Sequence, residues 1–141
     1  MGYDKLVERA DRLSENGRSD AARKFYEKAI ELKPSGVEAI TGLGYCDLDK
    51  ERYMAAIDNF KRALNYSSSY GEAIIGIAEA YKIRGDKSHA VEYYKRYLKA
   101  QPGGPKAAMA QKNLRDLEPP ASENKPNDDT EKPRAPDEPP P

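Results

Sequence analysis

Residues 71–104, GEAIIGIAEAYKIRGDKSHAVEYYKRYLKAQPGG, contain the pattern that decides the fold. Their first half has apolar side chains at the i, i+3, i+4, i+7 spacing of one helix face: Ile74, Ile77, Ala78 and Tyr81. Gly85 interrupts this pattern, and glycine suits the left-handed conformation that follows a helix C-terminus. A second apolar stripe then runs through Ala90, Tyr94, Tyr97 and Leu98 until Pro102 ends it. The stretch therefore predicts two helices joined by a short turn.

The same pattern occurs three times at a period of 34 residues, over 3–36, 37–70 and 71–104. Small residues align in two columns, Ala10, Gly44 and Ala78, then Ala22, Ala56 and Ala90. An aromatic column follows at Tyr26, Phe60 and Tyr94. Small residues let two helices approach closely, and the aromatic rings fill the space beside them. Because one helix pair cannot bury its own apolar stripe, we expect the three pairs to stack around a continuous core.

These columns, with prolines at 34 and 102, resemble the tetratricopeptide repeat (TPR) family over residues 3–104. The resemblance implies an all-α fold, a right-handed α-solenoid of three helix-turn-helix repeats. Residues 105–117 have a further apolar stripe, and Pro105 suits a first helical turn. We expect this segment to be a capping helix, which brings the total to seven helices and no strands. Asp47 departs from the pattern, because its column holds apolar or aromatic side chains in the other repeats, so its charge implies exposure or a partner.

Composition divides the chain into a TPR domain, residues 1–117, and a tail, residues 118–141. The whole chain has 24 basic and 24 acidic residues. The tail has seven acidic residues against three basic ones, which leaves a net charge of +4 on the domain. Eight of the eleven prolines also lie in the tail, and it has no large apolar side chain. Since it cannot bury enough surface to offset the entropy of ordering, we expect a disordered acidic, proline-rich tail or linker.

Several classes of protein are excluded by what the sequence lacks. One cysteine and one histidine make an internal disulfide impossible and a histidine-ligated metal site improbable. Cys46 falls in a small-residue column and is expected to be a buried, inert thiol. There is no phosphate loop, dinucleotide-binding motif or nucleophile elbow, no signal-peptide pattern, and no apolar run near the ~18 residues of a membrane span. We expect a cytoplasmic protein with no catalytic activity, metal or cofactor.

The resemblance to the TPR family implies a concave groove that holds a peptide or helix of a partner protein, lined by the first helix of each pair. When the groove positions of the family are carried over to this sequence by register, the candidate groove has eight acidic residues and one basic residue. Five apolar or aromatic residues in it are expected to face outward, and Gly42 and Gly76 are expected to let a partner's backbone come close. The candidate groove residues are Asp4, Val7, Glu8, Asp11, Glu15, Glu38, Thr41, Tyr45, Leu48, Asp49, Glu72, Ile75, Glu79, Lys82 and Ile83.

An acidic and partly apolar groove predicts a protein partner that presents Lys or Arg beside apolar anchors. The simpler interpretations are that the acids are ordinary solvated charges and that the apolar side chains pack between helices. A carboxylate clamp for acidic chaperone tails is not expected, because the places of its Lys, Asn and Arg hold Val7, Asp11, Gly42, Glu72 and Gly76. The second helices interleave basic and acidic residues, as a solvated face does, so no nucleic-acid partner is expected.

The sequence therefore favours a scaffold or adaptor that binds a partner protein. One alternative is a self-association or spacer module of a larger protein, in which an apolar edge near Met109, Leu114 and Leu117 pairs copies weakly. The other is a substrate chaperone or assembly factor, which would use the same groove for a different client.

Overall fold

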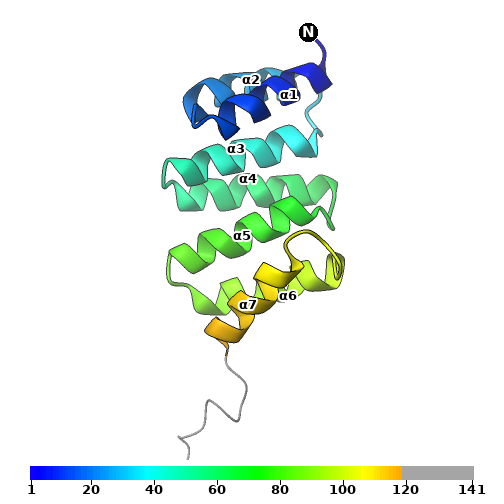
Figure 1. Cartoon of the computed structure of the whole chain (residues 1–141). Coiled ribbons are helices and arrows are strands. Elements are labelled where there is room, and N and C mark those ends of the chain that lie inside the picture. The colour runs from blue at the N-terminus through cyan, green and yellow to red at the C-terminus, as the bar shows by residue number, and fades with distance from the viewer. Residues whose placement is uncertain (119–141) are drawn as a thin grey trace, which may run out of the picture.

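The computed structural model describes residues 1–118, and within this range the secondary structure is entirely helical. The helices stack in order as three pairs with a single helix at the end (Figure 1). The first helices of the pairs begin at residues 3, 37 and 71 and the second at 19, 53 and 87, so the 34-residue period is kept. The seven helices are α1 (Tyr3–Glu15), α2 (Ser19–Leu32), α3 (Val37–Asp49), α4 (Tyr53–Tyr66), α5 (Gly71–Ile83), α6 (Lys87–Ala100) and α7 (Ala107–Leu117).

The predicted all-α solenoid with seven helices is thus confirmed over residues 1–118. The prediction of a disordered tail concerns residues 118–141, and all of these except Glu118 lie outside the described part of the chain.

The turn inside each pair has one residue in the left-handed region, always in the same column. Gly17 has φ 79°, Gly85 has φ 82° and Glu51 has φ 60°. In each turn the next residue's N–H donates back to a carbonyl oxygen near the end of the first helix, as Arg52 N–H does to Asp47 O at 2.8 Å. Glu51 is the only non-glycine residue with positive φ in residues 1–118. The backbone therefore makes the same turn three times, although the second repeat lacks the glycine.

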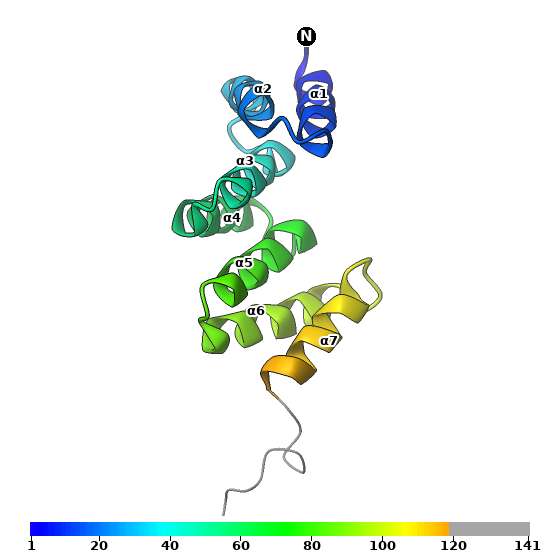
Figure 2. The same cartoon turned by 60° about the vertical axis from the view of Figure 1, so that its left-hand side comes forward.

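The first helices lie on the inner side of the array. Contacts join α1 to α3 and α3 to α5, in addition to the contacts within each pair, and no comparable contact joins α2 to α4 in the part of the chain described. Helices whose neighbours of the same kind are closer together lie on the inside of a curve. Figure 2 shows the successive pairs turned relative to one another as the array proceeds.

Aromatic rings of the second helices pack into the next repeat at glycines. A Cβ atom on Gly42 would lie 2.3 Å from the Tyr26 ring, and one on Gly76 would lie 2.6 Å from the Phe60 ring. The expectation that these glycines admit a partner's backbone is therefore wrong. They admit an aromatic side chain of the protein itself, which a Cβ would displace.

One of the columns expected in the groove is buried. Val7, Thr41 and Ile75 are 9%, 1% and 1% exposed, so the expectation that Val7 and Ile75 face outward is wrong. Each belongs to the first helix of its pair, and these first helices contact one another along the array. Register within a single pair does not show this burial, because the contacts between first helices form only when the repeats stack.

The last helix, α7, occupies the place of the first helix of a fourth repeat. Ala110 lies 34 residues after Gly76 and is fully buried, as a small residue at that place should be. The helix begins at Ala107, two residues later than expected, because residues 102–106 form turns in which Lys106 N–H donates to the Tyr97 hydroxyl at 3.1 Å. Leu114 and Leu117 pack against the core, so much of the apolar edge expected to pair copies is already covered.

Asp47 is 3% exposed and has partners, which is one of the two outcomes its position allowed. Arg23 of α2 donates a hydrogen bond to its Oδ1, and the Asn59 amide of α4 donates to its Oδ2 at 2.8 Å. The Arg52 guanidinium lies 3.9 Å from Oδ1. The carboxylate thus joins α2, α3 and α4 at the junction between the first and second repeats.

Candidate partner-binding site

The fifteen candidate groove residues all lie on the inner helices α1, α3 and α5. Tyr45, Leu48 and Glu79 are half-buried. Apart from the buried column already described, the remaining candidates are exposed: Asp4, Glu8, Asp11, Glu15, Glu38, Asp49, Glu72, Lys82 and Ile83. The structure gathers most of them into two pockets and one cleft. Asp4, Val7, Glu8 and Ile75 line none of these three.

Four carboxylates meet at the first of these places, which we call the acidic pocket. It has a volume of about 280 Å³ and no basic residue in its wall. Its residues come from both helices of the first pair and from α3 and α5: Asp11, Ser14, Glu15, Tyr26, Glu38, Thr41, Gly42, Tyr45 and Glu72. The potential in this pocket is therefore negative, although the domain as a whole carries a net positive charge.

Tyrosine hydroxyls hold the wall of the acidic pocket in place. The Tyr26 hydroxyl donates to Asp11 Oδ1, and the Tyr45 hydroxyl donates to the backbone oxygen of Glu72 at 2.8 Å. Burial raises the pKa of both phenols, and the neighbouring carboxylates raise it further. Thr41 differs, because its buried hydroxyl has no hydrogen-bond partner. Both tyrosines of the pocket are thus tied to its wall, and Thr41 supplies its one buried hydroxyl without a partner.

A second pocket, the C-terminal pocket, lies between α5 and α7. It has a volume of about 460 Å³ and a mainly apolar lining. Leu48, at the end of α3, and Tyr94 of α6 complete a wall whose members are Leu48, Glu79, Lys82, Ile83, Tyr94, Met109, Lys112 and Asn113. Ile83 is 59% exposed, which makes it one of the few large apolar side chains on the surface of residues 1–118.

The polar groups of the C-terminal pocket are only partly paired. Lys82 Nζ donates to Asn113 Oδ1 at 2.6 Å, and Lys112 Nζ donates to Asp116 Oδ2 at 3.0 Å, so both cations are engaged within the protein. Burial raises the pKa of Glu79, while the nearby lysines oppose this rise. Burial also raises the pKa of Tyr94 to about 12, with a smaller contribution from Glu79. The Tyr94 hydroxyl is buried and has no hydrogen-bond partner.

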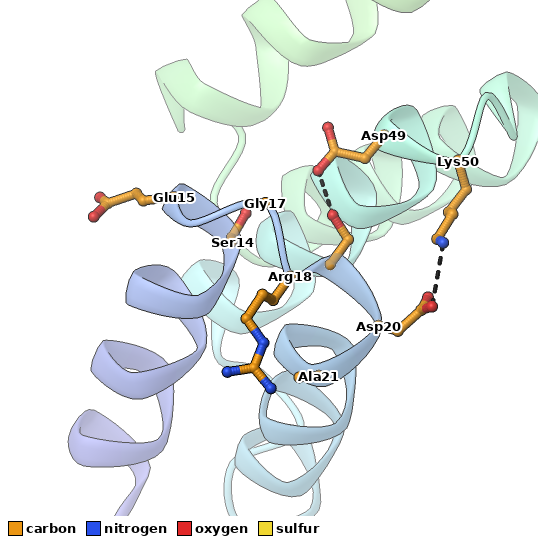
Figure 3. Close-up of a pocket in the computed structure, with 9 residues that line it drawn as sticks. Ser14, Glu15, Gly17, Arg18, Asp20, Ala21, Asp49 and Lys50 are labelled. Atoms are coloured by element: carbon orange, nitrogen blue, oxygen red, sulfur yellow. Dashed lines mark hydrogen bonds and ion pairs between the residues drawn. The ribbon is translucent and has the colours of Figure 1, made fainter.

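The third place is a polar cleft of about 690 Å³ between the α1–α2 turn and the end of α3 (Figure 3). Here Asp49, an expected groove residue, accepts a hydrogen bond from Ser19 at 2.5 Å, and Lys50 pairs with Asp20 at 3.2 Å. Both interactions join the first repeat to the second. The wall of this cleft has three acidic and two basic side chains, so it lacks the single sign of the acidic pocket.

Sequence reasoning missed four residues of the C-terminal pocket. The sequence places Tyr94 in the core, where it is indeed fully buried, but does not indicate that it also lines a pocket. It places Met109 at a self-association edge, and Lys112 and Asn113 at no site. The signal that could have found Met109 and Asn113 is the 34-residue register. Met109 and Asn113 follow Ile75 and Glu79 by one period, which places α7 on the inner side of the array.

The single reactive side chains are engaged or protected. Cys46 is 1% exposed, and burial raises the pKa of its thiol to about 11, as expected for a thiol between packed helices. His89 is exposed; its ring lies against the Tyr81 ring, and its Nδ1 lies 2.8 Å from Asp86 Oδ2. Within residues 1–118, no group of three His, Cys, Asp or Glu side chains is placed to hold a metal ion. None of the helices in that range is long and apolar enough to cross a bilayer.

Two curated proteins share sequence similarity with this chain. The BBSome complex member BBS4 of Bos taurus is 30% identical over 79 residues, which is 56% of this chain and 15% of that protein. The tetratricopeptide repeat and J domain-containing co-chaperone DNJ1 of Cryptococcus neoformans is 29% identical over 96 residues, 68% of this chain and 18% of that protein. The chain thus spans less than a fifth of the length of either relative.

Solved structures share the fold at low sequence identity. The type III secretion chaperone SycD of Yersinia enterocolitica, in complex with a peptide of the translocator YopD, superposes with a TM-score of 0.75 at 16% identity, over 81% of this chain and 90% of that one. The first TPR of Spaghetti (RPAP3), bound to the HSP90 peptide SRMEEVD, gives 0.74 at 20% identity, over 82% and 89%. The sequence also matches the family described as Tetratricopeptide repeat over residues 7–63 and 47–105. Since this match covers most of the helical array, the chain belongs to the tetratricopeptide repeat family.

Proposed function

We propose that this protein is a scaffold or adaptor that holds a segment of a partner protein against its inner helices, and that the segment presents basic and apolar side chains. The observation that carries the proposal is the acidic pocket, where four carboxylates converge with no basic residue in the wall. A Lys or Arg side chain of the partner would be attracted to this pocket, and an Asp or Glu side chain would be repelled from it. The apolar lining of the C-terminal pocket supports the second half of the proposal.

Two solved structures of the same fold support peptide binding as the general activity, since they contain a peptide of YopD and a peptide of HSP90. The HSP90 peptide SRMEEVD has three acidic residues and one basic residue, so its net charge is negative. The present chain has Asp11 and Glu72 where a carboxylate clamp would require basic or amide side chains, so we propose a ligand of the opposite charge. A substrate chaperone would use the same surface, and only the identity of its client would distinguish it.

The test compares two fluorescent peptides of equal length that differ only in having Lys or Glu beside leucines. The full chain should bind the Lys peptide, more weakly as salt rises, and should not bind the Glu peptide. Glu15→Lys with Glu72→Lys should weaken the Lys peptide at least tenfold in fluorescence anisotropy.

A matched control reverses two carboxylates on the outer helices, Glu31→Lys with Glu92→Lys. This control gives the same change of net charge and should leave the affinity unchanged. Equal effects of the two pairs would show that net charge alone governs binding, and would contradict the groove assignment.

A further inference from the structure

The two pockets occupy the same place in the repeat, two periods apart. Six residues of the acidic pocket have a counterpart 68 residues later in the wall of the C-terminal pocket. The pairs are Asp11 with Glu79, Ser14 with Lys82, Glu15 with Ile83, Tyr26 with Tyr94, Thr41 with Met109, and Tyr45 with Asn113. The helix α7 takes the place of a first helix. It therefore forms the C-terminal pocket with the third repeat, just as α3 forms the acidic pocket with the first repeat. The helix that caps the core therefore also builds a second pocket.

The equivalent place at the middle junction holds a side chain of the protein itself. The counterpart of Asp11 and Glu79 there is Tyr45, and the counterpart of the two tyrosines is Phe60. The ring centroids of Tyr45 and Phe60 lie 4.8 Å apart in an edge-on arrangement, and the Tyr45 hydroxyl reaches the backbone of Glu72. This ring takes up space that the shorter acidic side chains leave open at the other two junctions.

The chemistry of the two pockets differs, although their place in the repeat does not. Thr41 and Glu15 of the acidic pocket are replaced by Met109 and Ile83 in the C-terminal pocket. The two buried hydroxyls without a hydrogen-bond partner in residues 1–118 are those of Thr41 and Tyr94, and each belongs to the wall of one pocket. Buried polar groups are nearly always paired, so their coincidence with the two pockets is a second, independent sign of function.

Resting on the proposed function, we infer that one extended segment of the partner fills both pockets, with a Lys or Arg in the acidic pocket and a Leu, Met or Phe in the C-terminal pocket. Two steps between packed helices, of about 8–10 Å each, place the pockets roughly 20 Å apart. An extended chain rises about 3.3 Å per residue, so the two side chains are about six residues apart in the partner's sequence. The segment between them crosses Tyr45.

The test uses peptides with a Lys-Arg pair and one Leu separated by two, four, six, eight or ten Gly/Ser residues, titrated into the isotopically labelled full chain. Chemical shifts of the Thr41 and Asn113 amides report the two pockets separately, even at weak affinity. When about six Gly/Ser residues separate the basic pair from the Leu, both amide signals should shift along one binding curve. The Kd of this peptide should be at least tenfold lower than the Kd of the peptides with two or ten such residues, because its second contact becomes intramolecular.

Ile83→Asp should reduce the affinity of the best peptide to that of a peptide without Leu. Ile83 is exposed, so the fold should survive this change. Met54→Asp, at an exposed apolar residue of α4 on an outer helix, is the control and should have no effect. Shifts at Thr41 alone, with affinity independent of spacing, would overturn the two-pocket inference and leave the proposed function standing. Shifts at neither amide would overturn both.

Discussion

Glu51 has a backbone conformation that Gly17 and Gly85 adopt without strain at the equivalent places. An L-residue in the left-handed region brings its Cβ close to the following carbonyl oxygen, which costs about 1–2 kcal/mol. The Glu51 side chain is exposed, and the backbone hydrogen bonds of the turn form as they do in the other two repeats. The second repeat thus keeps the turn at an energetic cost that the first and third do not have.

Replacing this residue should stabilise the protein. Glu51→Gly should raise the free energy of unfolding by about 0.5–1 kcal/mol, since relief of strain exceeds the entropy that glycine adds to the unfolded chain. Urea denaturation followed by circular dichroism measures it. Gly85→Ala is the matched reverse change and should lower stability by about 1 kcal/mol. A loss of stability in Glu51→Gly would show that the glutamate makes a contact that outweighs its strain.

At the scale of elements, α2, α3 and α4 are joined through the buried Asp47 carboxylate. Its side chain is 5% exposed, whereas that of its partner Arg23 is 26% exposed. In the other repeats the column of Asp47 holds Leu13 and Tyr81, and the column of Arg23 holds Ile57 and Val91. The junction between the first and second repeats therefore uses an ion pair where the junction between the second and third has Ile57 and Tyr81 in the apolar core.

Removing one member of this pair should cost much more than removing both. Asp47→Leu alone should lower the free energy of unfolding by about 3 kcal/mol, because Arg23 and Asn59 lose their acceptor. Arg23→Ile with Asp47→Leu should recover most of this loss, since apolar residues of suitable size often replace a buried ion pair without penalty. A double-mutant cycle by urea denaturation measures the coupling. Additive effects would mean that the two side chains act independently.

At the scale of the whole molecule, stability depends on how the array ends. Without a further helix, the face of α6 that bears its aromatic rings would be exposed to solvent. The helix α7 covers this face with Ala110 and the half-buried Met109, Leu114 and Leu117. Repeat arrays need such an end helix to remain soluble. The helix thus completes both the core and the C-terminal pocket.

A chain that stops at Gly104 should be less stable than one that stops at Glu118 by about 3 kcal/mol, as expected from the loss of three or four partly buried apolar side chains. It should also associate, because the uncovered surface of α6 is apolar. Urea denaturation and light scattering on the two truncated chains measure both effects. Equal stability and a monomer in both cases would show that α7 adds nothing to the core.

The sequence was sufficient to predict the architecture, because the period and the small-residue columns report contacts that repeat identically along the chain. The number of helices and their order followed from these columns. The site was predicted only in part. Val7 and Ile75 have the spacing of groove residues within their own pairs, but both are buried in the stacked array.

Two further features depended on the relation between repeats rather than on residues within one. The glycines at 42 and 76 receive rings from the preceding second helix, which no pattern along α3 or α5 alone reveals. The C-terminal pocket requires α7 to be counted as the start of a fourth repeat. In each case the missing information was the placement of a residue 16 or 34 positions away in the chain.

The inner helices have two distinct sets of residues: the buried column Val7, Thr41 and Ile75, and the exposed carboxylates beside it. Selection can act on these two sets independently. Buried positions of α1, α3 and α5 hold the repeats together, whereas the exposed carboxylates on the same helices belong to the surface that we propose for a partner. Substitutions at the exposed positions can therefore accumulate without unfolding the array. If the proposed function holds, a few changes at these exposed positions would alter the charge of the segment that binds, while the buried columns keep the array folded.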